Sequence, residues 1–127
     1  MKKIGFITTN KVFAQSLATL IRSNAELSLE PYLMHNPQQA ALDVEVLGVD
    51  VAVVVADAGT AQEHEAALSL CNDLRRSSPC CRILLLVQQD VPDARDAALQ
   101  AVKDNLADDF MFCDSSLDYL LAKLLAY

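Results

Sequence analysis

The chain has 127 residues, 53% of them hydrophobic, which suits one domain with a sizeable core. Its 17 Asp and Glu against 10 Lys and Arg leave a formal net charge of −7, and an acidic domain lacks the basic clusters with which proteins neutralise nucleic-acid phosphates. No apolar run approaches the ~20 residues that cross a bilayer, and the stretch after Lys2 and Lys3 is interrupted at Thr8, too early for a signal peptide. We therefore expect a cytoplasmic protein that binds neither nucleic acid nor membrane.

Five short apolar runs predict β-strands, and a helical pattern follows each of them. The run 51–56 (VAVVVA) is β-branched and apolar on both faces, as in a strand that helices cover on both sides. Pro31 interrupts the second run, and because proline cannot donate to a sheet ladder, this strand should lie at an edge. The predicted strands cover residues 3–8, 27–34, 51–56, 83–87 and 110–113.

The predicted helices have recognisable ends and buried faces. Asn10 and Asn36 are candidate N-caps, and the last helix is expected to open at Ser115-Ser116. Gly48 is a natural stop for the second helix, and Asn105 can supply the left-handed end of the fourth. The predicted inward-facing residues are Phe13, Leu17, Leu20 and Ile21 in the first helix, Ala41, Val44 and Leu47 in the second, Ala67, Leu70, Cys71 and Leu74 in the third, Ala94, Ala98 and Ala101 in the fourth (90–104), and Leu117, Leu120, Leu121, Leu124 and Leu125 in the last.

Strictly alternating strands and helices predict a parallel sheet with helices on both faces. Right-handed crossovers leave few topologies, and the flavodoxin-like strand order 2-1-3-4-5 puts the Pro31 strand at one edge. We therefore predict an α/β fold of (βα)5 type, a doubly wound parallel five-stranded sheet that forms one domain over residues 1–127.

The four cysteines are Cys71, Cys80, Cys81 and Cys113. The adjacent pair Cys80-Cys81 does not have the C-x-x-C spacing of a metal site. Without an export signal the thiols should stay reduced, and we interpret them as core or loop thiols rather than redox or metal-binding groups.

In an open α/β sheet the functional crevice lies beyond the carboxyl ends of the central strands. There the sequence places Thr8, Thr9, Asp57 and Cys113, with no histidine and no basic residue. No Gly-rich phosphate loop follows the first strand, so nucleotide binding is not supported. We predict no catalytic residues, no metal and no cofactor.

The two histidines, His35 and His64, are expected to be ordinary polar surface residues. Asp57 is the one acid at the end of a central strand. Its carboxylate could accept a phosphoryl group, cap the following helix or simply solvate a loop.

Two segments resemble the response-regulator receiver (CheY-like) domain. The ending A-D-D-F-M-F, at 107–112, followed by S-L-D-Y-L-L, at 116–121, is similar to the family's A-D-D-Y-L-x-K-P-F-S-x-x-E-L-L. The opening K-I-G-F-I-T-T-N, at 3–10, is similar to K-I-L-I-V-D-D-N. The resemblance covers essentially the whole chain and implies the receiver fold and a role in signal transduction.

The resemblance also implies a site, and this chain departs from it at most positions. Thr8 and Thr9 stand where the family has the acid pair that holds Mg²⁺, Val87 stands at the Thr or Ser position, and Cys113 replaces the lysine. Phe110 occupies the position of the switch aromatic residue.

The phosphoacceptor position depends on the register of the third strand. Matching Asp50 to the family's entry aspartate places Val55 there, whereas the spacing to the fourth strand selects Asp57, which we prefer. A trianionic donor at Asp57 needs nearby positive charge, which neither threonine nor cysteine supplies. The chain is therefore predicted to be an atypical receiver, a pseudo-receiver that works without Mg²⁺-dependent phosphorylation and is not an enzyme.

Such a module would act through a protein partner, an output domain or a second copy. The resemblance implies a face formed by the fourth helix, fifth strand and fifth helix, with Ala97, Ala101, Lys103, Asp104, Asp108, Tyr119 and Lys123. Two alternatives remain open. One is a flavodoxin-like small-molecule-binding or phosphocarrier domain, and the other is a receiver that is still phosphorylated at Asp57.

Overall fold

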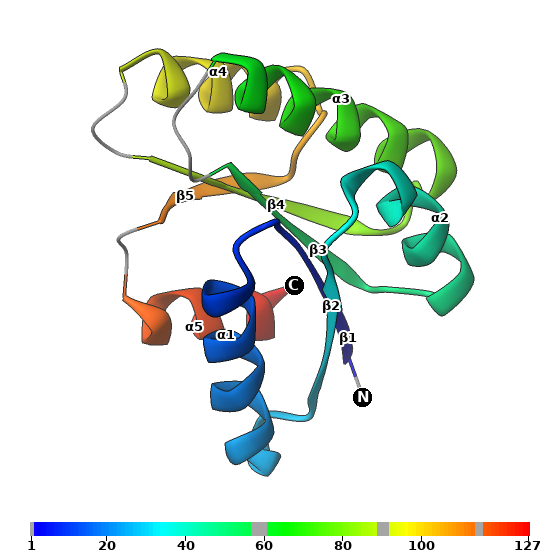
Figure 1. Cartoon of the computed structure of the whole chain (residues 1–127), viewed down its shortest axis with the longest axis vertical. Helices are drawn as coiled ribbons and strands as arrows, with labels where there is room; N and C mark the ends of the chain where they lie inside the picture. Colours follow the sequence, from blue (N-terminus) through cyan, green and yellow to red (C-terminus); the bar gives the residue numbers. More distant parts are fainter. Residues whose placement is uncertain (1, 57–60, 89–91, 114–115) are drawn as a thin grey trace.

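The computed structural model describes residues 2–56, 61–88, 92–113 and 116–127, apart from the side chains of Ala25, Ala61, His64, Pro92 and Leu117. Within these residues the strands form one parallel sheet in the order β2-β1-β3-β4-β5, as predicted (Figure 1). The strands are β1 (Lys2–Ile7), β2 (Leu29–Met34), β3 (Val51–Ala56), β4 (Arg82–Val87) and β5 (Asp109–Phe112). The helices are α1 (Lys11–Ser23), α2 (Pro37–Leu47), α3 (Ala61–Ser77), α4 (Pro92–Lys103) and α5 (Leu117–Ala126), with a 3₁₀ turn, η1, at Ala25–Leu27.

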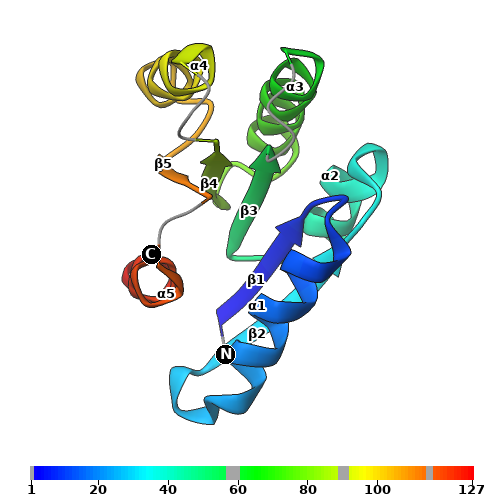
Figure 2. The same cartoon turned by 60° about the vertical axis from the view of Figure 1, so that its left-hand side comes forward.

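Helices cover both faces of the sheet, with α1 and α5 on one side and α2, α3 and α4 on the other (Figures 1 and 2). Strand β3 is buried along its whole length and sends alternate side chains to the two sides. Val51, Val53 and Val55 pack toward α1 and α5, whereas Ala52 and Val54 pack toward α2, α3 and α4. Each face therefore has its own apolar core. Among the described residues, no helix is long and apolar enough to cross a membrane.

Local sequence accounts for several helix ends. The Asn10 side chain accepts the Phe13 N–H at 3.0 Å and caps α1, and Ser116 caps α5 in the same way through the Tyr119 N–H. Asn36 caps α2, and Gly48 ends it with a φ of 67°, which a side chain would strain. The predicted caps at Asn10 and Asn36 and the predicted stop at Gly48 are confirmed, and the structure assigns the N-cap of the last helix to Ser116.

The edge position of β2 is also confirmed, and Pro31 lies opposite Ile4 of β1 in the register. The predicted start of this strand was wrong, because Leu27 belongs to the 3₁₀ turn and Ser28 has a φ of 54° that interrupts the extended chain. Strand β5 begins at Asp109, one residue earlier than predicted.

The predicted helix faces are largely confirmed. Among the described members of the predicted α5 face, Leu120, Leu121 and Leu124 are buried, but Leu125 is 45% exposed because it lies at the margin of the face that α5 packs on the sheet. Helix α4 is described from Pro92 to Lys103, and its predicted start at residue 90 lies outside the described residues. Asn105, with a φ of 61°, follows α4 as predicted.

Two aspartates align the starts of neighbouring strands. Asp50 accepts the Lys3 N–H on its carboxylate at 2.8 Å and donates its own N–H to the Lys3 carbonyl at 2.9 Å, joining β3 to β1. Asp108 makes the same exchange with Ile83 and joins β5 to β4. Its carboxylate accepts the Ile83 N–H at 2.7 Å, and its own N–H donates to the Ile83 carbonyl at 2.9 Å. Each pair of bonds sets the register at the point where the two strands begin.

Asp108 also pairs with arginines. Its carboxylate lies 3.1 Å from the Arg75 guanidinium and 3.5 Å from that of Arg82, and its side chain is only 20% exposed. Arg75 in turn donates to the Asn105 carbonyl at 2.9 Å, so α3, β4 and the end of α4 converge on this carboxylate.

We predict that Asp108→Ala lowers the free energy of unfolding by about 2–3 kcal/mol, because the Ile83 N–H and Arg75 lose a charged acceptor in a partly buried place. Asp108→Asn should cost less, since the amide oxygen still accepts one bond. The measurement is urea unfolding followed by circular dichroism, with the exposed Asp96→Ala as the control, expected within about 0.5 kcal/mol of the unaltered protein. A loss at Asp108 no larger than that at Asp96 would contradict this role.

Candidate functional site

The carboxyl ends of the central strands meet at one edge of the sheet. Ile7 lies opposite Val54, and Val87 lies between Ala56 and Phe112 in the register. The residues that follow these strands, Thr8 and Cys113 among them, therefore gather at this edge. Asp57 follows β3 directly but lies outside the described residues.

Thr8 and Thr9 end β1 without a charge. Thr8 is 3% exposed, and its hydroxyl accepts the Asn10 N–H at 3.0 Å, so this side chain shapes the turn into α1. Its backbone N–H donates to the Met34 carbonyl at 3.1 Å, and its carbonyl lies 3.2 Å from a ring nitrogen of His35, which is an exposed residue, as predicted. Thr9 is exposed.

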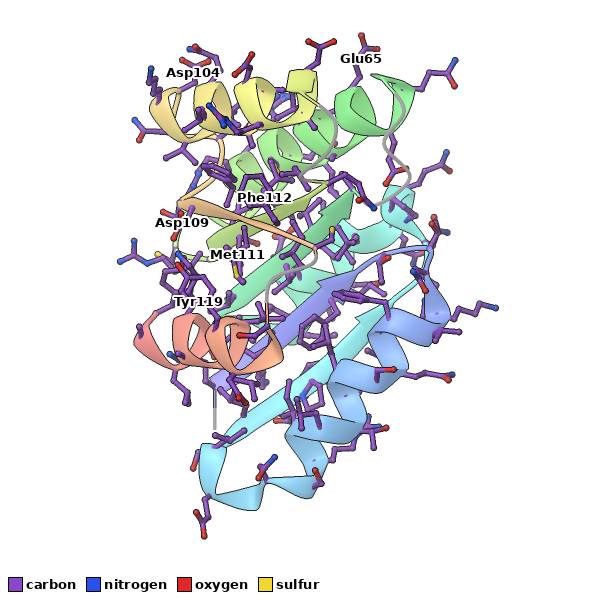
Figure 3. The ribbon with its side chains drawn as sticks, turned by 90° about the vertical axis from the view of Figure 1, so that its left-hand side faces the viewer. Glu65, Asp104, Asp109, Met111, Phe112 and Tyr119 are labelled. Carbon is purple, nitrogen blue, oxygen red and sulfur yellow. The ribbon has the colours of Figure 1, made fainter. Side chains whose placement is uncertain are left out.

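The other described positions are apolar or neutral. Val87 is 1% exposed, and its carbonyl accepts the Cys113 N–H at 2.8 Å, which holds Cys113 beside the end of β4. Phe110 is half-buried and meets Phe112 edge to face, with ring centroids 5.8 Å apart (Phe112 is labelled in Figure 3).

A hollow of about 210 Å³ opens beside this edge, between the ends of β1 and β3 and helices α2 and α3. Glu63 is the one carboxylate among its described lining residues. The described lining residues are Ile7, Thr8, Thr9, Pro37, Val54, Val55, Glu63, Ala66, Ala67 and Leu70.

Mg²⁺ in a receiver would need oxygen ligands at this edge, preferably carboxylates. Thr8 and Thr9 offer neutral hydroxyls, and one of these is engaged with a backbone N–H. In the described parts of the chain, no three His, Cys, Asp or Glu side chains are grouped to hold a metal ion. The residues that end β1 do not fit a magnesium site of the receiver type.

Two of the cysteines are core thiols, as the sequence indicated. Burial raises the pKa of Cys71 to about 12 and that of Cys81 to about 11, so both stay protonated at neutral pH. Cys80 is exposed in the turn before β4, and Cys113 is half-buried.

The predicted contact face is made of α4, β5 and α5 (Figure 3). Lys103 and Asp104 are exposed, Ala97 is half-buried, and Tyr119 is 53% exposed with the Lys123 ammonium 5.4 Å from its ring centroid. Including Ala101 was wrong, because it is 2% exposed and belongs to the inward stripe of α4 with Ala94 and Ala98. Asp108 is engaged in the strand alignment described above.

Asp109, which the sequence did not single out, joins β5 to α5. Its carboxylate pairs with Lys123, lies 3.1 Å from the Tyr127 hydroxyl and accepts the Phe110 N–H at 2.8 Å. Burial alone would raise the pKa of Asp109, but the hydrogen bonds from Lys123 and Phe110 hold it below its usual value. Burial likewise would lower the pKa of Lys123, and the bond to Asp109 raises it instead. No sequence signal reveals these contacts, because the partners lie 14 and 18 residues from Asp109.

No family model and no curated protein sequence matches the chain. Solved structures do match it over nearly its full length. A response regulator from Burkholderia pseudomallei with a phosphorylated aspartic acid is 25% identical with a TM-score of 0.72, and the match covers 98% of this chain and 66%, just under two thirds, of that one. The Francisella response regulator 1452 receiver domain is 18% identical with a TM-score of 0.77, covering 98% and 93% of the two chains.

A third match is a protein described as belonging to a family of redox sensors in the streptococci that evolved from two-component response regulators. It is 16% identical with a TM-score of 0.77, and the match covers 99% of this chain and half of that one. The chain therefore has the response-regulator receiver (CheY-like) fold, as its opening and ending motifs predicted, with a sequence that has diverged far from these relatives.

The Asp109–Lys123 pair generates a pH-dependent prediction. The pKa of Asp109 is lower in the folded state than in the unfolded state. Its contribution to stability is therefore present above the unfolded-state pKa of ~3.9 and is lost as the pH falls through the folded-state pKa. Lys123→Met should therefore lower the free energy of unfolding by about 0.3–1 kcal/mol at neutral pH, since the pair is partly exposed.

At about pH 2.5, where Asp109 is protonated in the unfolded state, the difference between Lys123→Met and the unaltered protein should shrink. Urea unfolding at both pH values measures it, and Lys103→Met on the exposed end of α4 is the matched control. A loss in Lys123→Met that persists unchanged at acid pH would show that packing of the lysine stem, rather than the ion pair, is responsible.

Proposed function

We propose that the chain is a pseudo-receiver: a signalling module that acts by binding proteins and does not use Mg²⁺-dependent phosphorylation of an aspartate. The observation that carries the proposal is the set of neutral residues that the structure describes at the carboxyl ends of β1, β4 and β5. Thr8 is buried in a turn, Val87 is buried and apolar, and Cys113 carries no cation, where the receiver resemblance implies acids, a hydroxyl and a lysine.

The missing groups have a direct physical consequence. A phosphoryl donor brings several negative charges, which approach an aspartate only where metal ions or lysines offset the repulsion. The Val87 side chain cannot hydrogen-bond a phosphoryl group, so this position would not transmit a modification of Asp57 to Phe110. Both the phosphorylation reaction and the conformational response to it therefore lack the side chains that receivers use.

In this proposal the module signals through a protein–protein contact that does not depend on phosphorylation. The contact is made by α4, β5 and α5, either with an output domain or with a second copy of the chain. Tyr119 supports this because it is a large, half-exposed aromatic side chain beside a lysine, of a kind that often anchors interfaces. The similarity to a protein of a redox-sensor family that evolved from two-component response regulators supports a signalling role other than phosphorylation.

The test is a titration with Mg²⁺ and beryllofluoride, a phosphoryl mimic, followed by melting temperature. Because a ligand that binds only the folded state raises stability, a working acceptor site would raise Tm. We expect no shift, while a phosphorylatable receiver domain run in parallel should respond. A shift that disappears in Asp57→Asn would overturn the proposal, and flavin absorbance in the purified protein would indicate the small-molecule alternative instead.

A second measurement addresses self-association. If two copies pair through α4, β5 and α5, Tyr119→Ala should weaken the dimer about tenfold or more in analytical ultracentrifugation. Val12→Ala, at an exposed apolar residue of α1, should leave it unchanged. A chain that stays monomeric at all concentrations would exclude the homodimer and leave a different protein as the partner.

A further inference from the structure

Helices α2 and α3 lie side by side on one face of the sheet (Figures 1 and 2). Their side chains leave a groove between the two helices. Two hollows of about 210 Å³ each share Pro37, Ala66 and Leu70. One reaches the carboxyl edge of the sheet, and the other runs outward along the two helices. We call the outer one the α2–α3 groove, and it is lined by Pro37, Gln38, Ala41, Ala66, Ser69, Leu70 and Asp73.

The crest of α2 beside this groove is apolar. Leu42 is 54% exposed and Val46, one turn further along, is 74% exposed. A helix that only covers a core normally exposes polar residues to solvent. Two neighbouring large apolar residues on the outer side of α2 are therefore not explained by packing of the core and indicate a contact surface. Val12 on α1 is equally exposed but stands singly.

The two helices that flank the groove carry more acids than bases. Helix α2 carries Asp43 and Glu45 and no basic residue, and α3 carries Glu63, Glu65 and Asp73, with its two arginines, Arg75 and Arg76, in the last turn. Asp73 lines the groove itself, and Arg75 is engaged with the Asp108 carboxylate. Helix α4 differs, since Arg95 and Lys103 lie among its acids. The one-sided charge favours a positively charged partner.

We propose that the α2–α3 groove, with Leu42 and Val46 at its crest, binds a basic amphipathic helix of a partner protein. Apolar side chains at helical spacing would pack on Ala41, Leu42 and Leu70, while lysines or arginines on the flanks face Glu45 and Asp73. A second copy of the chain is a poor occupant, because a symmetric pair would bring two acidic grooves together. This surface is separate from α4, β5 and α5 and does not depend on whether Asp57 is phosphorylated.

The probe is a 14-residue helical peptide of leucine and lysine, with leucines at i, i+3, i+4 and i+7 spacing, titrated into ¹⁵N-labelled protein. A peptide with glutamate in place of lysine is its control. We expect the lysine peptide to shift the amide signals of Ala41, Leu42, Val46, Ala66 and Ser69, with an affinity that falls as salt rises. The glutamate peptide should leave them in place.

Matched variants separate a built surface from general attraction to an acidic protein. Leu42→Ser with Val46→Ser should weaken binding about tenfold or more, whereas Leu99→Ser with Leu125→Ser, exposed on other helices, should change it by less than about twofold. Glu45→Gln with Asp73→Asn should weaken binding more than Asp93→Asn with Asp96→Asn, which removes the same charge from α4. All eight residues are surface residues, so the variants should fold.

Shifts spread over the whole surface, shifts centred on α4, β5 and α5, or equal losses in both serine pairs would overturn the proposal. The mass of the protein without peptide is a further check. If the protein is a dimer and the double variant Leu42→Ser with Val46→Ser is a monomer, the occupant of the groove is a second copy and the proposal is overturned. Because the readout is peptide binding rather than a response to beryllofluoride, failure here and failure of the pseudo-receiver proposal are distinguishable.

Discussion

Burial of β3 on both faces is the constraint on which the rest of the structure depends. A central parallel strand offers its backbone to two neighbours and its side chains to two helical layers, so every residue from Val51 to Ala56 must be apolar. The alternation of its side chains divides the core between α1 and α5 on one side and α2, α3 and α4 on the other. The same parallel arrangement brings the carboxyl ends of the five strands to one edge.

That edge has the geometry of a receiver site and lacks its charges in the described residues. Thr8 uses its hydroxyl to build the β1–α1 turn, and Val87 and Cys113 close the ends of β4 and β5 through a backbone hydrogen bond. The scaffold does not require charged residues at this edge, because strand order and helix packing depend on the apolar core rather than on the polar residues there. Function on such a scaffold is then expected at its surfaces, where the acidic α2–α3 groove and the face around Tyr119 differ in charge and shape.

The consecutive aspartates of the A-D-D segment, Asp108 and Asp109, both have structural roles. Asp108 accepts the Ile83 N–H and pairs with Arg75, which sets the start of β5 against β4. Asp109 points to α5 and holds Lys123 and Tyr127. Asp108 directly precedes β5 and Asp109 begins it, and the two carboxylates reach α3 and α5, which cover opposite faces of the sheet.

The sequence by itself determined the fold, because the period of its apolar residues, its caps at Asn10, Asn36 and Ser116, and the proline in β2 all depend on local chemistry. It also revealed the neutral residues at the carboxyl edge, since topology alone decides which strand ends meet there. Only the tertiary structure decided that Ala101 belongs to the inward stripe of α4 and not to the contact face, that Asp108 and Asp109 serve the sheet and α5, and that α2 and α3 leave a groove between them. Those features depend on contacts between residues far apart in the chain, and the direction of a side chain at the margin of a helix face is set by its neighbours in space rather than by its neighbours in sequence.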